Sequence, residues 1–187
     1  FMTNYLNQSD YDLFFKIHKN ILLFTNKISK ISKKFKKLDD WGEYTNFMND
    51  ACKLRNHLFD NKNWIDQFIK ENPANFNQEE LEITKNWKKA IAGNFIILKH
   101  LKKHSIFLHN ESNQIYAIIG LMQPIEEVAS KECLPVLVGA ALIPFQGRIV
   151  YDGVLSGGDV IIGNNYKREF NEKYMDDKKA EKIIEKI

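Results

Sequence analysis

A glycine-punctuated apolar run at residues 134–163 is the feature that most constrains how this chain can fold. Its short apolar segments and frequent turn residues are typical of antiparallel strands, whereas the patterning before about residue 92 is typical of helices. The chain therefore changes architecture midway. This change predicts an α+β protein in which helices come first and a sheet follows.

Two turn signals divide the apolar run, Pro144-Phe-Gln-Gly147 and Ser156-Gly-Gly-Asp159. Asp152-Gly153 is a competing signal, but a turn at this point would leave strands too short to pair well. We therefore expect Asp152-Gly153 to form a bulge within a continuous strand. The strands predicted from this pattern span residues 136–143, 148–155 and 160–162.

A single long helix is predicted from about Asp10 to Lys37. Apolar residues recur there at alternating steps of three and four, which is the heptad spacing of one helical seam. Ser9 can cap the helix, and the lysine-rich end complements the helix dipole. The seam consists of Phe14, Ile17, Ile21, Phe24, Ile28, Ile31, Phe35 and Leu38.

Three further helices are expected before the sheet. The second begins with a capping box formed by Asp40 and Glu43 and runs to about Phe59. Its short connection to the first helix favours an antiparallel helical pair. Gly93 is expected to end the fourth helix and to mark the boundary with the sheet. The third and fourth helices are predicted at residues 63–70 and 78–92.

The remaining elements complete a small curved antiparallel sheet or a partly open barrel. A polar turn at residues 110–113 separates two apolar runs and predicts a hairpin, and Pro124 suits the first turn of a short helix at 125–130. From Asn164 the polar chain predicts a C-terminal helix that packs on the body. Strands are also expected at residues 95–101, 105–109 and 115–122. The regions expected are a helical region at 2–92, a sheet region at 93–163 and the terminal helix at 164–187.

Composition narrows the classes of protein that fit this chain. It has 187 residues, of which 44% are hydrophobic, and its net charge is only +3. Because the apolar runs are interrupted, we expect neither a secretion signal nor a membrane-spanning helix. Cys52 and Cys133 are interpreted as buried thiols in a reducing compartment. A cytoplasmic protein follows, and the abundance of Lys, Asn and Ile indicates a microbial one.

The histidines His100, His104 and His109 suggest a metal site. His100 and His104 would share a face on a strand or across one helical turn. However, the intervening glutamate of a metalloprotease helix is missing, and Lys102 and Lys103 would repel a divalent cation. Metal binding at His100 and His104 is therefore a minor alternative, and no cofactor is expected.

Polar residues within the apolar strands form a second candidate site, Arg148, Tyr151 and Asp152. In a functional interpretation Arg148 clamps an anion and Tyr151 lies beside it. The alternative is that Arg148 and Asp152, four residues apart on one strand, share an outward face and simply contact water.

Six lysines fall within eleven residues that contain no acidic residue. At a helix end they would neutralise several phosphates, and such binding is sensitive to salt and indifferent to nucleotide sequence. The alternative is a solvated helix surface whose charge Asp39 and Asp40 partly cancel. The six are Lys27, Lys30, Lys33, Lys34, Lys36 and Lys37.

Patterns that indicate catalysis are missing from the sequence. Ser156 lacks a nucleophile elbow, Cys133 has no histidine nearby, and no phosphate-binding loop is present. We therefore expect a non-catalytic binding or interaction protein, with a protein partner or a second copy of the chain. A nucleic-acid-associated protein that uses the lysines is the first alternative, and a metal-dependent or other hydrolase is the second.

Overall fold

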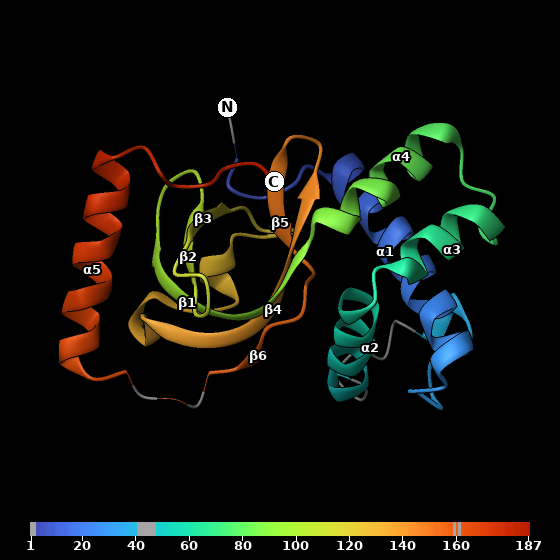
Figure 1. Ribbon diagram of the computed structural model, residues 1–187, viewed down its shortest axis with the longest axis horizontal. Coiled ribbons are helices and arrows are strands. Elements are labelled where there is room, and N and C mark those ends of the chain that lie inside the picture. The colour runs from blue at the N-terminus through green and yellow to red at the C-terminus, as the bar shows by residue number, and fades with distance from the viewer. Residues whose placement is uncertain (1–2, 41–47, 159, 161) are drawn as a thin grey trace.

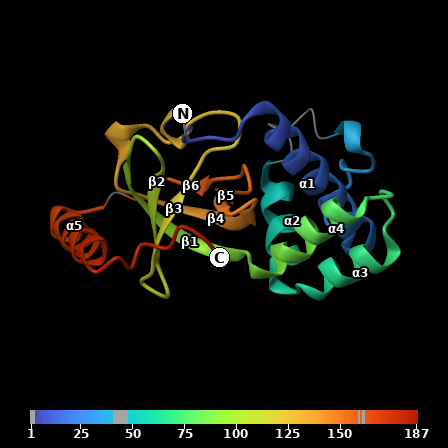
Figure 2. The ribbon, with the colours of Figure 1, turned by 90° about the horizontal axis from the view of Figure 1, so that it is seen from above.

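The computed structural model describes residues 3–40, 48–158, 160 and 162–187. A curled sheet lies in the middle, helices α1 to α4 cover one side of it, and α5 covers the other (Figures 1 and 2). This arrangement confirms the α+β fold. The helices are α1 (Gln8–Ser29), α2 (Met48–Asp60), α3 (Asn63–Glu71), α4 (Gln78–Asn86) and α5 (Asn164–Lys179). The strands are β1 (Ile91–His100), β2 (Ser105–His109), β3 (Ile115–Ile118), β4 (Val136–Phe145), β5 (Arg148–Tyr151) and β6 (Ser156–Gly157).

The main sheet has the strand order β3-β2-β1-β4-β5, which is a Greek key because β4 lies beside β1. β1 is shared by two halves, since residues 91–97 pair with β4 and residues 95–100 pair with β2. A register break between Ile97 and Lys99 allows this strand to bend. The edge strands meet where the Ile119 N–H donates to the Ile149 carbonyl at 3.0 Å, so the sheet curls into a half-barrel.

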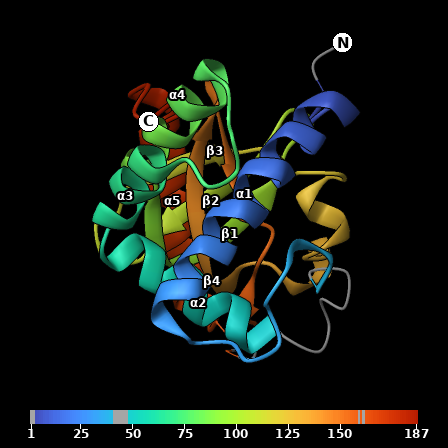
Figure 3. The same ribbon diagram turned by 90° about the vertical axis from the view of Figure 1, so that its right-hand side faces the viewer.

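The main hydrophobic core lies between the sheet and the helical layer, with α1 crossing in front of the strands in Figure 3. Phe14 of α1 contacts Trp87 and, edge-on, Phe145 of β4, with ring centroids 5.3 and 5.4 Å apart. All three rings are fully buried. The helical region and the sheet therefore share one core. A smaller cluster lies under α5 and contains Ile96, Leu98, Ile106, Leu108, Ile115 and Tyr174.

The first helix ends at Ser29, so the predicted end at Lys37 is wrong. The buried side chain of Asn26 donates to the carbonyls of Ser32 and Phe35 and accepts the N–H of Ser32. These bonds satisfy the backbone of a chain that folds back on the helix. Phe35 consequently returns to the core from a non-helical segment.

The start of α1 and its apolar seam agree better with the prediction. Asn7, rather than Ser9, is the N-cap, and its side chain accepts the Asp10 N–H at 2.9 Å. The seam is buried as far as Phe24, whereas Ile28 is 39% exposed. The pattern therefore identified the buried face of the helix but not where the helix ends.

The fourth helix is also shorter than predicted. It ends at Asn86, a short 3₁₀ turn follows, and Ile91 already begins β1. Gly93 thus lies within a strand rather than at a helix end. A Cβ at Gly93 would lie 2.9 Å from His109 Nε2, so the glycine permits a close approach between neighbouring strands. The capping box predicted for the second helix includes Glu43, which lies outside the described residues.

The turns predicted for the segment after β5 differ from those in the structure. β5 ends at Tyr151, and Gly153 adopts a φ of 83°, so Asp152-Gly153 is not a bulge in a continuous strand. Ser156 and Gly157, predicted as a hairpin turn, pair with β4 as β6. Of the strand predicted at 160–162, residues 160 and 162 are described, and both lie outside strands.

Smaller differences concern the segment between β3 and β4. β3 ends at Ile118 because Gly120 exchanges backbone hydrogen bonds with the N-terminal segment instead. Two 3₁₀ turns, Ile125–Glu127 and Lys131–Cys133, replace the predicted helix. Cys133 is exposed and Cys52 is only half-buried, so the prediction of two buried thiols is wrong. None of the described helices combines the length and apolarity that a bilayer span requires.

Candidate functional site

The structure separates the three polar residues that the sequence grouped around Arg148. Tyr151 and Asp152 are buried, at 5% and 1% exposure, so the alternative in which Asp152 faces water is wrong. Burial, with the nearby carboxylate of Asp152, raises the pKa of Tyr151 to about 12. Of the three, only Arg148 reaches the surface, where its side chain is 37% exposed.

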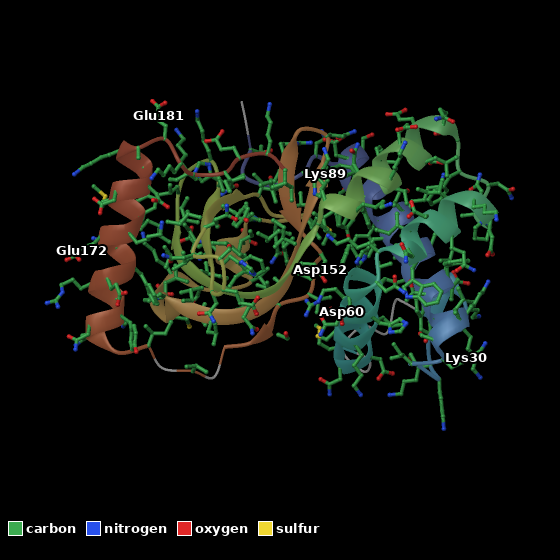
Figure 4. The ribbon with its side chains drawn as sticks, viewed as in Figure 1. Lys30, Asp60, Lys89, Asp152, Glu172 and Glu181 are labelled. Carbon is green, nitrogen blue, oxygen red and sulfur yellow. The ribbon has the colours of Figure 1, made fainter. Side chains whose placement is uncertain are left out.

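Asp152 instead faces Arg55, which α2 presents to the sheet. Arg55 Nη1 lies 3.4 Å from the carboxylate of Asp152 and 2.9 Å from the carbonyl of Val154, and both charged side chains are at most 3% exposed. The other carboxylate oxygen accepts the Ala141 N–H. Burial raises the pKa of Asp152, whereas Arg55 and the backbone N–H donors oppose that shift. Figure 4 shows Asp152 at the junction between barrel and helices.

Sequence reasoning missed Arg55. A signal was present, because Ala51, Leu54, Arg55 and Leu58 all lie on the buried side of α2. A charged residue on the apolar face of an amphipathic helix needs a buried partner. Its partner is 97 residues away in the sequence, so the pair could not be identified without the fold.

A cleft of about 850 Å³ opens near the place where the edge strands of the half-barrel meet. Arg148 and Ile149 of β5, Ala117 of β3 and the turn residues Lys103 and His104 line it, together with the chain that follows α5. The described residues that line it are Thr3, Asn7, Lys103, His104, Ala117, Ile119, Gln146, Gly147, Arg148, Ile149, Glu185 and Lys186.

The cleft has more cations than anions in its lining. Lys103, Arg148 and Lys186 outnumber Glu185, and a smaller adjoining cavity of about 210 Å³ adds Lys89. The two cavities share Arg148 and Lys186. Four cationic side chains therefore line the two adjoining cavities, and the carboxylate of Asp10 offsets the charge of one of them, Arg148.

Arg148 is held in place rather than left mobile. Its Nη2 lies 2.6 Å from the carboxylate of Asp10 in the first turn of α1. In its better orientation, the side-chain amide of Gln146 donates to the same carboxylate at 2.8 Å. The side chain of Asp10 is 19% exposed and that of Arg148 is 37% exposed, so the pair lies at the cleft wall and the Arg148 side chain is partly accessible to solvent.

The two histidines of the metal hypothesis have different surroundings. Nδ1 of His100 contacts Ser105 Oγ at 2.7 Å and its Nε2 contacts the Ala129 carbonyl at 2.8 Å, so both ring nitrogens are already used. His104 lies in the cleft wall, where burial lowers its pKa and Glu185 opposes that shift. In the described part of the chain, no group of three His, Cys, Asp or Glu side chains is placed to hold a metal ion.

The six lysines of the basic run are all exposed, but they do not lie on one helix. Beyond Ser29 the segment is irregular, and its turn is held by Asp40, whose carboxylate accepts the N–H groups of Lys36 and Lys37 at 2.8 and 2.9 Å. These bonds lower the pKa of Asp40. Lys30 and Lys89 lie well apart in Figure 4, so this basic segment is distinct from the cleft.

Comparisons with known proteins give no assignment. A scan against models of protein families, a search of curated proteins and a search of solved structures each found no match. The site must therefore be interpreted from its own geometry. A half-open cleft with a fixed guanidinium, two ammonium groups and apolar walls can bind an anion by charge-assisted hydrogen bonds.

Proposed function

We propose that this protein is a non-catalytic binding protein whose barrel cleft takes an organic anion, such as a phosphorylated small molecule. The observation that carries the proposal is the convergence of Lys103, Arg148 and Lys186, from three separate segments, on one cleft. A volume of about 850 Å³ is in the usual range of small-molecule sites. Arginine and lysine are the side chains that most often bind phosphate groups in proteins.

The remaining lining divides the cleft into an apolar and a charged part. Ala117, Ile119 and Ile149 provide apolar surface for the uncharged part of a ligand. The turns that follow β1 and β4 flank the opening, and in oligonucleotide-binding Greek-key barrels the loops at these positions also flank the ligand. This is an analogy of topology, and it supports only the position of the site.

Calorimetric titration with paired probes tests the proposal. We expect heat of binding with adenosine monophosphate and glucose 6-phosphate but not with adenosine and glucose, because the phosphate provides the charge-assisted contacts. Arg148→Gln should weaken binding about tenfold or more, and Glu185→Gln should strengthen it. Lys179→Gln, at an exposed position on α5, is the matched control. Equal binding of wild type and Arg148→Gln would contradict the proposal.

A second function, association with nucleic acid, is favoured by the basic segment. All six lysines project from a segment that Asn26 and Asp40 hold in a defined conformation. Phe35, the aromatic residue within the described segment 27–37, is buried. Binding here would therefore use phosphate contacts rather than base stacking.

Fluorescence anisotropy with a labelled DNA duplex at several salt concentrations tests this second function. In the test variant, Lys33, Lys34, Lys36 and Lys37 are all replaced by glutamine. The slope of log affinity against log salt concentration should then fall in magnitude by about 3 to 4, since each phosphate contact contributes about 0.9. An equal number of exposed lysines elsewhere serves as control, namely Lys131, Lys167, Lys179 and Lys182. If both quadruple variants lose affinity equally, binding is a general charge effect and the segment has no special role.

A further inference from the structure

Three cavities adjoin one another along the chain that follows α5. The middle one is the candidate cleft of about 850 Å³. It shares His104 and Glu185 with a cavity of about 630 Å³ beside α5. It also shares Arg148 with the cavity of about 210 Å³ beside the helical layer, and Lys186 lines all three. The ligand site proposed above is therefore part of a longer groove.

The charge of this groove differs between its two ends. Two glutamates and two lysines line the cavity beside α5, so charge is nearly balanced there. Among the described residues that line the small cavity none is acidic, whereas Lys89, Arg148 and Lys186 are cationic. Lys89 and Glu181, which belong to opposite ends, lie on opposite sides of the barrel in Figure 4. A second anionic group is therefore favoured in the small cavity and not beside α5.

Two of the three cations in the small cavity are available to a ligand. Lys89 and Lys186 are exposed, and neither forms an ion pair with another described residue. Arg148 differs, because the carboxylate of Asp10 already offsets part of its charge. Lys89 thus adds to the small cavity a positive charge that the protein itself leaves uncompensated.

The helical layer positions Lys89 at the cavity wall. Lys89 ends the short 3₁₀ turn that Trp87 begins, and the Trp87 side chain is fully buried in the main core. The preceding lysine has a different role, since Lys88 Nζ lies 2.6 Å from the carboxylate of Asp66 and Lys88 does not line the cavity. Two neighbouring lysines therefore differ in both charge compensation and position.

The small cavity has room for a phosphate group. Its volume of about 210 Å³ is several times the share of roughly 30 Å³ that one water molecule takes in the liquid. The exposed side-chain amide of Asn86 lies in its wall and adds neutral N–H donors to the ammonium groups.

We propose that the small cavity is a second anion subsite, so that the ligand is a small molecule with two phosphate groups, one in each cavity. This inference rests on the proposed function of the cleft. Arg148 and Lys186 line both cavities and serve both phosphates, whereas Lys89 serves the second phosphate alone.

Calorimetric titration with matched ligands tests the second subsite. One pair is glucose 6-phosphate and glucose 1,6-bisphosphate, and the other is adenosine monophosphate and adenosine diphosphate, in which the two phosphates are adjacent. In at least one pair the second phosphate should tighten binding about tenfold, because it gains charge-assisted contacts. Lys89→Gln should remove this gain and leave the affinity for the monophosphate unchanged. Arg148→Gln should weaken the binding of both members of the pair.

Lys88→Gln is the matched control, since it makes the same change of charge one residue away, and it should preserve the gain. The second subsite is overturned if neither pair shows a gain, or if Lys88→Gln and Lys89→Gln reduce the gain equally. In both cases the monophosphates still bind, so the proposed function of the cleft stands. If no phosphorylated probe binds, both proposals are overturned. Thermal melts confirm that each variant is folded.

Discussion

The two layers that cover the half-barrel are built differently. The helical layer shares a single core with the sheet, in which Phe14 and Trp87 contact one another and a buried ion pair joins Arg55 to Asp152. On the other side, Tyr174 and Asp177 are the only buried residues of α5. α5 therefore covers a small cluster of the outer sheet face, whereas the helical layer completes the core.

This difference indicates two units of unequal stability. Local opening is expected where few apolar contacts hold an element, and global unfolding where the core is continuous. The chain after α5 returns to β3 through two backbone bonds of Ile184, to Ala117 and Ile115, and then lines the cleft with Glu185 and Lys186. Opening of α5 would consequently alter the candidate cleft without disrupting the helical layer.

The largest loss of stability is expected for Arg55→Met, which removes the buried ion pair between the helical layer and the sheet. Removal of the cation leaves the buried carboxylate of Asp152 uncompensated, and such losses cost about 3–5 kcal/mol. Urea denaturation of the variant measures this loss. In a double-mutant cycle, Asp152→Leu should cost much less in the Arg55→Met background than in the wild type. A loss below about 1 kcal/mol for Arg55→Met would show that the pair does not join the two layers.

We expect the protein to lose stability in acid because of His18, which is buried in the helical layer. Burial, together with the charges of Arg55 and Lys19, lowers its pKa from 6.5 to about 3. Below pH 6.5 the unfolded chain therefore binds a proton that the folded chain does not, and stability falls by about 1.4 kcal/mol per pH unit. By pH 4 the loss should be about 3 kcal/mol.

Urea denaturation between pH 7 and pH 4 checks this slope. His18→Leu cannot be protonated and should give a flatter dependence, whatever its stability at pH 7. The raised pKa of Asp152 acts in the opposite sense, because the folded state then binds its proton more readily than the unfolded state. The difference between wild type and His18→Leu isolates the histidine, and equal slopes would contradict the prediction.

Tyr174→Ala tests the α5 side of the comparison. The ring is 4% exposed and packs on the small cluster, so its removal should cost about 2 kcal/mol, less than for a ring in the main core. Hydrogen exchange of the Ala117 amide, which donates to Ile184, should accelerate, while exchange in α1 changes little. Equal acceleration in α1 and β3 would show that α5 and the helical layer unfold together.

The sequence predicted those parts of the fold that depend on local pattern. The period of α1 identified its buried face, the polar turn at residues 110–113 between two apolar runs identified β2 and the hairpin, and the glycine-punctuated apolar run identified β4. The end of α1 depends on Asn26, whose carboxamide contacts residues six and nine positions away. A propensity argument cannot detect such a side-chain contact, because helix continuation and chain reversal are equally consistent with the lysine-rich sequence.

The candidate site shows the same limit. Arg148 and His104 were selected for different reasons, an anion clamp and a metal ligand, and the fold brings them to one cleft. Lys103 and Lys186 were not selected, because the meeting of a turn with the chain after α5 depends on the barrel itself. Arg148 is partly exposed, whereas Tyr151 and Asp152 are buried. β5 ends at Tyr151, and the end of a strand cannot be located reliably from a pattern of five residues.

The smallest effect concerns the lysine that lies over the Tyr174 ring. Lys99 Nζ is 4.1 Å from the ring centroid and 3.0 Å from the Asn171 side-chain oxygen, and burial lowers the pKa of this lysine. Lys99→Met keeps the aliphatic stem but removes the charge, and should cost about 0.5–1 kcal/mol. Lys178→Met is the matched control, since Lys178 Nζ is 6.0 Å from the same ring and should contribute less. If thermal melts show equal losses of stability for both variants, the distance from the lysine Nζ to the ring does not determine how much each lysine stabilises α5. Tyr174 then contributes through apolar packing alone.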